Sequence, residues 1–158
     1  MARFRTTIST RATAAAALDL LADFQSAADW DPGVRSARLV GGSPGAVGAH
    51  YEVVAPFGLM QIPLDYEITE RVDPQGDQPG RVVLIARTGS FTSHDTITAV
   101  AEGTGSQVTY DAVLSLQGIR RVVDWPLNLT FQVIGSRAEH GLRAALESLA
   151  DASPRPSE

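Results

Sequence analysis

An alternation of apolar and polar residues recurs between residues 48 and 117, and no other feature of the sequence constrains the fold as strongly. A period of two indicates β-strands with one apolar face. Short turn-forming sequences at 56–59, 89–90 and 103–106 separate the segments, so the pattern predicts antiparallel hairpins with a shared apolar face. That apolar phase contains Ala49, Tyr51, Val53, Ile62, Leu64, Tyr66, Ile68, Val82, Leu84, Ala86, Phe91, Ile97, Ala99, Val108, Tyr110, Ala112, Leu114 and Leu116.

The lengths of the turns predict which residues pair across each hairpin. A four-residue turn at 56–59 would place Val53 opposite Ile62, and a similar turn at 103–106 would place Ile97 opposite Ala112. The Gly89-Ser90 pair suits a two-residue type II′ turn. All three hairpins bring apolar faces together, which predicts a continuous meander.

Helical sequence precedes the meander. Residues 3–9 alternate and are expected to form a strand, after which Thr13 is a candidate N-cap for a helix. Ala16, Ala17, Leu20, Leu21 and Phe24 share one face of that helix at spacings of three and four. A second short helix at 26–30 is expected to end at Asp31-Pro32-Gly33, because the residue before proline avoids the helical conformation. A strand at 34–40 follows.

The last long segment, 120–150, has a helical period. Its apolar stripe contains Leu127, Phe131, Ile134, Ala138, Leu142, Ala145 or Leu146, and Leu149. A helix of this length with one apolar stripe needs a large covering surface, and the apolar face of the meander is the available one. We therefore expect one domain over 1–150 and a disordered tail over 151–158, which contains two prolines.

Composition excludes several classes of function. The chain has no cysteine and no lysine, which excludes disulfides, thiolate nucleophiles and lysine Schiff-base chemistry. All 13 basic residues are arginines, they are scattered, and the net charge is −5, which argues against nucleic-acid binding. The sequence has no apolar run long enough to span a membrane and no signal-peptide core at its N-terminus, so we expect a cytoplasmic protein.

The order of these elements resembles the helix-grip or START-like superfamily. The residues that carry the resemblance are Trp30-Asp31-Pro32-Gly33-Val34, the glycine-rich connector 41–48, and the segments 90–98 and 105–110. The superfamily includes polyketide cyclase/dehydrase-like proteins, the major birch-pollen allergen and lipid-transfer domains. The chain is most similar to the small bacterial cyclase-like (SRPBCC) branch, over roughly residues 3–150.

The resemblance implies an α+β fold in which a curved antiparallel sheet of about seven strands wraps around a long C-terminal helix. Two short helices would follow the first strand. It also implies a ligand cavity of about 300–1,000 Å³ between the sheet and that helix. The alternation would make its ligand-binding residues Trp30, Tyr51, Leu64, Tyr66, Leu84, Phe91, Tyr110, Ala112, Leu114, Trp125, Leu127, Phe131 and Ile134. The alternative is that these side chains fill a solid core.

Asp95 is the strongest candidate for a catalytic residue. It lies on the apolar phase between Phe91 and Ile97, where an unpaired carboxylate is costly. It would act as a general acid or base with a raised pKa, or it would anchor a ligand hydroxyl group. A bulge that turns it outward, or an arginine partner, would give it a structural role instead. No His or Cys residues lie at metal-ligand spacing, so we expect no metal and no cofactor.

Three functions stay open at this point. The first is a binder of a hydrophobic, aromatic or polyketide-like natural product, acting as carrier or sequestering protein. The second is a polyketide aromatase/cyclase in which Asp95 and tyrosines transfer protons; the sequence leaves open whether the protein is an enzyme. The third is a protein-interaction module with a filled core. The expected partner is a small hydrophobic ligand, and the expected state is a monomer or homodimer.

Overall fold

A computed structural model describes residues 1–57, 59–116 and 124–152 of the chain. The side chains of Phe57, Met60, Leu116 and residues 124–136 lie outside this description. The elements, in chain order, are β1 (Ala2–Thr10), α1 (Ala14–Ala22), the 3-10 helix η1 (Phe24–Ser26), α2 (Ala27–Trp30), β2 (Ser36–Gly41), β3 (His50–Phe57), β4 (Met60–Val72), β5 (Gly80–Arg87), β6 (Phe91–Glu102), β7 (Gly105–Leu116) and α3 (Asp124–Ala152).

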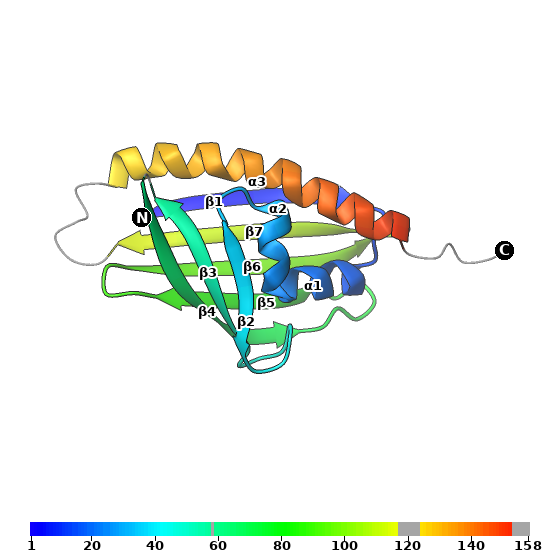
Figure 1. Cartoon of the computed structure of the whole chain (residues 1–158). Helices are drawn as coiled ribbons and strands as arrows, with labels where there is room; N and C mark the ends of the chain where they lie inside the picture. Colours follow the sequence, from blue (N-terminus) through cyan, green and yellow to red (C-terminus); the bar gives the residue numbers. More distant parts are fainter. Residues whose placement is uncertain (58, 117–123, 153–158) are drawn as a thin grey trace.

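The strands form one antiparallel sheet of seven strands, in the order β1-β7-β6-β5-β4-β3-β2. Figure 1 shows that β2, β3 and β4 cross steeply over the direction of β1, β7, β6 and β5, so the sheet is strongly curved. The helices lie along its concave side, and α3 runs nearly parallel to β1 and β7 (Figure 1). This arrangement confirms the α+β helix-grip fold that the sequence predicts.

The pairing of two hairpins differs from the prediction by two residues. Val53 lies opposite Leu64 rather than Ile62, and Ile97 lies opposite Tyr110 rather than Ala112. Pairing continues to Phe57 with Met60 and to Glu102 with Gly105, so both connections are shorter than predicted. A slip of two residues leaves every side chain on the same face, which explains why the alternation did not reveal it.

The third hairpin has the predicted pairing but a different turn. Leu84 lies opposite Asp95, as a two-residue connection requires. A type II′ turn needs a positive φ at its first central residue, and Gly89 is not among the glycines with positive φ. Instead, the Thr88 hydroxyl oxygen accepts the backbone N–H groups of Ser90 and Phe91, at 3.2 and 3.1 Å. The turn is therefore closed by this hydroxyl together with the Thr88 N–H, which donates to the Phe91 carbonyl oxygen at 2.9 Å.

Helix α1 begins at the predicted cap. The Thr13 hydroxyl accepts the Ala16 N–H at 3.2 Å, which satisfies one of the free donors of the first turn. The buried face of α1 is rotated from the predicted one, because Leu18 and Ala22 are buried whereas Ala16 and Leu20 are only partly buried. Helix α1 packs on the inner face of β5, β6 and β7.

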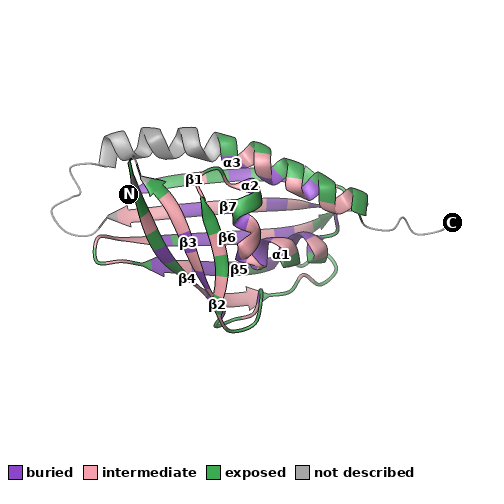
Figure 2. Cartoon of the chain, in the orientation of Figure 1, coloured by how far each residue is buried: buried purple, intermediate pink, exposed green. Residues whose placement is uncertain are grey.

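In the second half of α3, the predicted stripe is confirmed: Ala138, Leu142 and Leu146 are buried, and Ala145 and Leu149 are partly buried. Helix α3 ends at Ala152, so Asp151 and Ala152 belong to the helix and not to the predicted tail. Residues 153–158 lie outside the described residues. Figure 2 shows buried residues on the side of α3 that faces the sheet. No helix among the described residues is long and apolar enough to cross a membrane.

Candidate functional site

The inner face of β6 carries two polar residues, Ser93 and Asp95. Strand alternation places them on the same side as Ile97, and they are 5% and 3% exposed. The residues opposite Asp95 on the neighbouring strands are Leu84 and Ala112, which are also buried. The inward position of Asp95 is therefore confirmed, and the structure excludes both an outward bulge and an arginine partner for it within the described residues.

Asp95 accepts hydrogen bonds from two hydroxyl groups. Tyr110 Oη donates to Oδ2 at 2.6 Å, and Ser93 Oγ donates to Oδ1 at 2.9 Å. Burial raises the pKa of Asp95 from 3.8 to about 6, although both hydrogen bonds act in the opposite direction. Each carboxylate oxygen has room for one further donor.

Tyr66, on β4, lies on the same inner face as Ser93 and Asp95. It pairs with Ala86, and Ala86 in turn pairs with Ser93, so the three residues form one row across the sheet. Burial, and then the neighbouring Asp95 charge, raise the pKa of Tyr66 well above its usual range, while the Ser93 side chain lowers it. The small, fully buried side chain of Ala86 lies between Tyr66 and Ser93 in this row. We call Tyr66, Ser93, Asp95 and Tyr110 the inner polar cluster.

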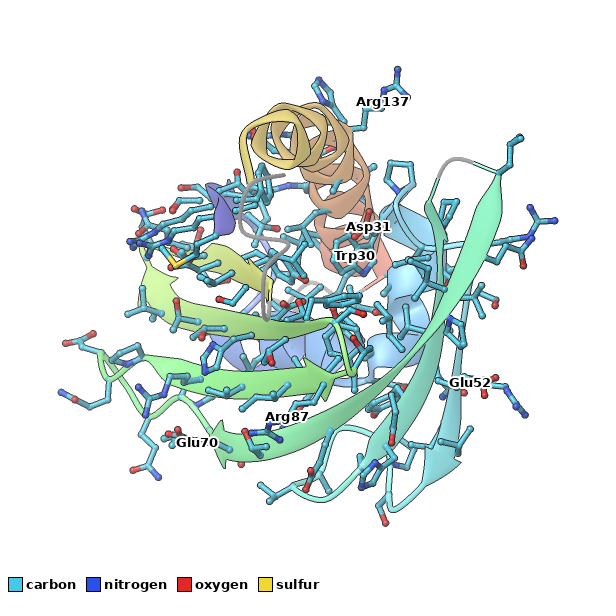
Figure 3. The ribbon with its side chains drawn as sticks, turned by 90° about the vertical axis from the view of Figure 1, so that its left-hand side faces the viewer. Trp30, Asp31, Glu52, Glu70, Arg87 and Arg137 are labelled. Carbon is cyan, nitrogen blue, oxygen red and sulfur yellow. The ribbon has the colours of Figure 1, made fainter. Side chains whose placement is uncertain are left out.

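The end of α2 brings two more side chains toward this cluster. Trp30 is 3% exposed, and its ring contacts Tyr110 edge to face, with 5.7 Å between the ring centroids. Asp31 follows it, and its carboxylate accepts the Gly33 N–H at 2.7 Å. Burial raises the pKa of Asp31, and the Gly33 bond partly opposes this shift. Figure 3 shows both residues on the inner side, between α3 and the sheet.

Tyr51 has a different environment from the other two tyrosines. Its hydroxyl accepts the N–H of Gly45 at 2.7 Å, and Arg71 donates to the Gly45 carbonyl at 2.8 Å. Phe24 contacts both Tyr51 and Tyr66, with centroid distances of 6.3 and 5.1 Å. The Tyr51 hydroxyl therefore anchors the connector between β2 and β3, and only its ring faces the interior.

The remaining predicted ligand-binding residues divide into two groups. Leu64, Leu84 and Ala112 are buried on the inner face, and Phe91 and Leu114 are partly buried there. The side chains of Trp125, Leu127, Phe131 and Ile134 lie outside the described residues, although their backbone belongs to α3. The cavity expected beneath this part of α3 therefore stays a prediction.

Two hollows open on the surface of the described residues, and neither includes the inner polar cluster. One, of about 430 Å³, is lined by α1 side chains together with Asp23, Ser26 and Leu149. The other, of about 310 Å³, lies over β3 and β4 and includes Leu64. The carboxyl and phenol groups of the inner polar cluster are thus buried in the interior and do not line either of these two hollows.

Metal-ligating residues do not gather anywhere in the described part of the chain. His50 pairs with Asp65 at 3.1 Å on the outer face, and His94 and His140 are exposed. These positions agree with the polar phases that the sequence assigns to the three histidines.

Two members of the interior were not identified from the sequence as functional residues. From the sequence, Ser93 belongs only to the segment 90–98, and Asp31 is only the residue before Pro32 at the end of the second short helix. The signal for Ser93 is its spacing of two from Asp95, which places both on one face. The signal for Asp31 is its position next to a large apolar residue that must be buried.

The arrangement combines a carboxyl group whose pKa is raised to about 6 with two phenol groups. Asp95 can accept a proton or a hydrogen bond from a bound molecule, and Tyr110 and Tyr66 can donate one. Apolar and aromatic side chains surround these groups, so a molecule bound against them would be held mainly by hydrophobic contact.

Comparisons with known proteins agree with this fold. A family model described as polyketide cyclase / dehydrase and lipid transport matches residues 1–153. No curated protein matches the sequence significantly. A STAR-related lipid transfer protein fragment from Xanthomonas axonopodis is similar in structure, with 21% identity, a TM-score of 0.71, and coverage of 91% of this chain and 85% of the other.

Two further solved structures share the fold. A START superfamily protein from Mycobacterium smegmatis has 11% identity and a TM-score of 0.69, with 93% and 98% of the two chains covered. The Zhui aromatase/cyclase from a Streptomyces species has 11% identity and a TM-score of 0.65, with 94% and 93% covered. At these identities the likeness concerns the fold alone.

Proposed function

Because the chain belongs to the polyketide cyclase/dehydrase and lipid transport family, we propose that it binds a small hydrophobic molecule between the inner face of the sheet and α3. The ligand is aromatic or polyketide-like, and the protein carries or sequesters it. Its location in the cytoplasm and its state as a monomer or homodimer stay predictions.

The single observation that carries this proposal is the inner polar cluster. A buried carboxylate lowers the stability of the fold by roughly several kcal/mol unless hydrogen bonds or opposite charges compensate for its lost hydration. Asp95 receives two hydroxyl donors and still has a raised pKa, so the compensation within the described residues is partial. A polar group of a bound molecule would complete the hydrogen bonding of Asp95, while the apolar wall holds the rest of the ligand.

The proposal is tested with two matched tyrosine variants. A panel of aromatic polyketides and fatty acids is screened by thermal shift, and the affinity of the best compound is measured by calorimetry. Tyr110→Phe removes a hydroxyl of the cluster, so we expect affinity to fall about tenfold, the typical value of one buried hydrogen bond. Tyr51→Phe removes a hydroxyl that binds Gly45 instead, and affinity should stay unchanged. If no compound binds, the interior is a filled core and the proposal is wrong.

A second function, that of an aromatase/cyclase, is favoured by one observation: Asp95, with a pKa of about 6, lies 2.6 Å from the Tyr110 hydroxyl. In such a reaction Asp95 would take a proton from a methylene between two carbonyls of a poly-β-ketone. The resulting enolate carbon would attack a second carbonyl, whose oxygen would take the Tyr110 proton as the new C–C bond forms. Asp95 would then return its proton to Tyr110, so the addition has no net proton change.

Asp95→Asn distinguishes the two functions. In a carrier this variant weakens ligand binding, because the acceptor for the polar group of the ligand is altered. In a cyclase it abolishes turnover of a poly-β-ketone thioester while the substrate still binds. Equal turnover by the wild type and the variant would exclude Asp95 as the catalytic base.

A further inference from the structure

Asp31 is a second carboxyl group that faces the inner polar cluster, and it comes from a different element. It directly follows Trp30, whose ring contacts Tyr110 with 5.7 Å between the ring centroids, and Figure 3 shows both residues on the inner side, between α3 and the sheet. In agreement with this position, its negative charge contributes to raising the pKa values of Asp95, Tyr66 and Tyr110. Within the described residues, the Gly33 N–H is the only hydrogen-bond partner of the Asp31 carboxylate, and this carboxylate forms no ion pair. Two carboxyl groups thus converge on one interior from the end of α2 and from β6.

No described cationic side chain balances these two groups. Every arginine with a described side chain is exposed apart from Arg71. Arg71 donates to the Gly45 carbonyl and pairs with Asp19 and Asp73, away from the cluster. His94 is next to Asp95 in sequence, but alternation places it on the outer face, where it is exposed. The described interior therefore contains acidic groups without basic ones.

Aromatic rings lie beside the two carboxyl groups. Trp30 contacts Tyr110 edge to face, and Phe24 packs against Tyr66. The faces of aromatic rings attract cations, and the attraction is larger when the site is desolvated. Carboxylates and aromatic rings together favour a cationic group and repel an anionic one.

We infer that Asp31 contacts the ligand and that, with Asp95, it selects hydrophobic molecules carrying a protonated amine. This inference rests on the proposed function, because it names the chemical class of the molecule bound there. An ammonium group has donors but no acceptor, which matches the free acceptor positions of the two carboxylates. A fatty-acid carboxylate in the same place would add a third negative charge to the interior.

The inference is tested with three probes that share one aromatic body: naphthylethylamine, naphthylethanol and naphthylacetate. Their affinities for the full-length protein are measured by calorimetry at neutral pH. A charge-assisted hydrogen bond is stronger than a neutral one, so the amine should bind about tenfold more tightly than the alcohol. The acid should bind most weakly of the three.

Asp31→Asn assigns this preference to Asp31. The asparagine Oδ1 can still accept the Gly33 N–H, so the variant removes the charge and keeps the turn. Amine affinity should fall about tenfold, while alcohol affinity stays unchanged. Asp29→Asn is the matched control: it removes an exposed charge from the same helix, and it should leave both affinities unchanged. Circular dichroism and the melting temperature show whether each variant is folded.

The possible failures are distinguishable. If the alcohol or the acid binds as tightly as the amine, or if Asp31→Asn weakens amine and alcohol equally, the amine selectivity is wrong and the proposed binding function stands. If none of the three probes binds while a compound of the polyketide panel does, the inference alone is contradicted. If neither the probes nor any compound of the panel binds, both the inference and the proposed function are contradicted.

Discussion

Asp95 occupies a position in β6 where an aliphatic side chain would cost the fold less. Its neighbours across the strands are Leu84 and Ala112, and its carboxylate depends on Tyr110 and Ser93 for compensation. Natural proteins retain such costly residues mainly where function requires them, which makes stability and activity compete at the same position. Asp95 therefore links the chemistry of the interior to a measurable penalty in folding free energy.

The penalty in folding free energy depends on pH. A comparison of the wild type with Asp95→Asn measures this dependence. The pKa of Asp95 is 3.8 ordinarily and about 6 in the folded protein, so between these values the folded state binds more protons than the unfolded state. The contribution of Asp95 to stability therefore falls as pH rises from about 4 to about 6, by about 3 kcal/mol. Asparagine does not titrate, so the variant should lack this decline.

Urea unfolding of both proteins at several pH values measures the difference. Burial also raises the pKa of Asp31, which is present in both proteins, so the difference between the two profiles reports the removal of the Asp95 carboxyl group. We expect the free energy of unfolding of the variant to increase relative to that of the wild type as pH rises, and this difference to persist above pH 6. Parallel pH profiles would contradict the raised pKa.

At the scale of elements, the contact between α2 and α3 holds the acidic end of α2 in place. A Cβ atom at Gly141 would lie 1.9 Å from the Trp30 carbonyl oxygen, so only glycine permits this approach of α3 to α2. Trp30 in turn contacts Tyr110. Gly141 thus determines how closely α2 approaches α3, and with it the position of Trp30 and Asp31 next to the inner polar cluster.

Gly141→Ala should separate the two helices. Alanine favours a helix by about 1 kcal/mol over glycine, but the clash with backbone requires α3 to shift, as in an overpacked core, which costs typically about 1–3 kcal/mol. We expect a net loss of unfolding free energy in urea, together with weaker ligand binding. Gly89→Ala is the control, because a Cβ there meets no atom within 4 Å. A gain of about 1 kcal/mol in Gly141→Ala, the value of helix propensity alone, would show that the helix contact is not tight.

The hairpins show which part of the fold the sequence determines and which part it leaves open. Alternation assigned the inner faces of β3 to β7 correctly, because burial on one side of a sheet imposes a period of two. The pairings of β3 with β4 and of β6 with β7 were wrong by two residues, because that slip exchanges inner residues only for other inner residues. The length of the connection decides between the two registers. That length depends on turn geometry such as the positive φ of Gly103.

The site was predictable to a similar extent. The inward position of Asp95 follows from alternation alone, and so does its sharing of a face with Tyr110. The proximity of Tyr66 to Ser93 needs the register across β4, β5 and β6, which a shift between Ile68 and Glu70 alters. The approach of Asp31 needs the packing of α2 on α3. The proximity of Tyr66 to Ser93 and the approach of Asp31 both depend on tertiary packing, which a local sequence pattern does not contain.

At the scale of the whole molecule, a curved sheet and a long helix enclose an interior whose described side chains are apolar apart from a small set of carboxyl, phenol and hydroxyl groups. The outer surface holds the exposed ion pairs, such as Arg3 with Asp111, whose net contribution to stability is small. The net charge of −5 has the same sign as the interior carboxyl groups. Electrostatics and burial together favour ligands that are apolar and carry hydrogen-bond donors.

A crystal structure of the protein with the tightest-binding compound of the screen tests the central claim most directly. We expect the compound between α3 and the concave face of the sheet, with a polar atom within hydrogen-bond distance, about 3 Å, of the Asp95 carboxylate or the Tyr110 hydroxyl. A compound bound only in a surface hollow, with the inner polar cluster enclosed by packed side chains, would contradict it.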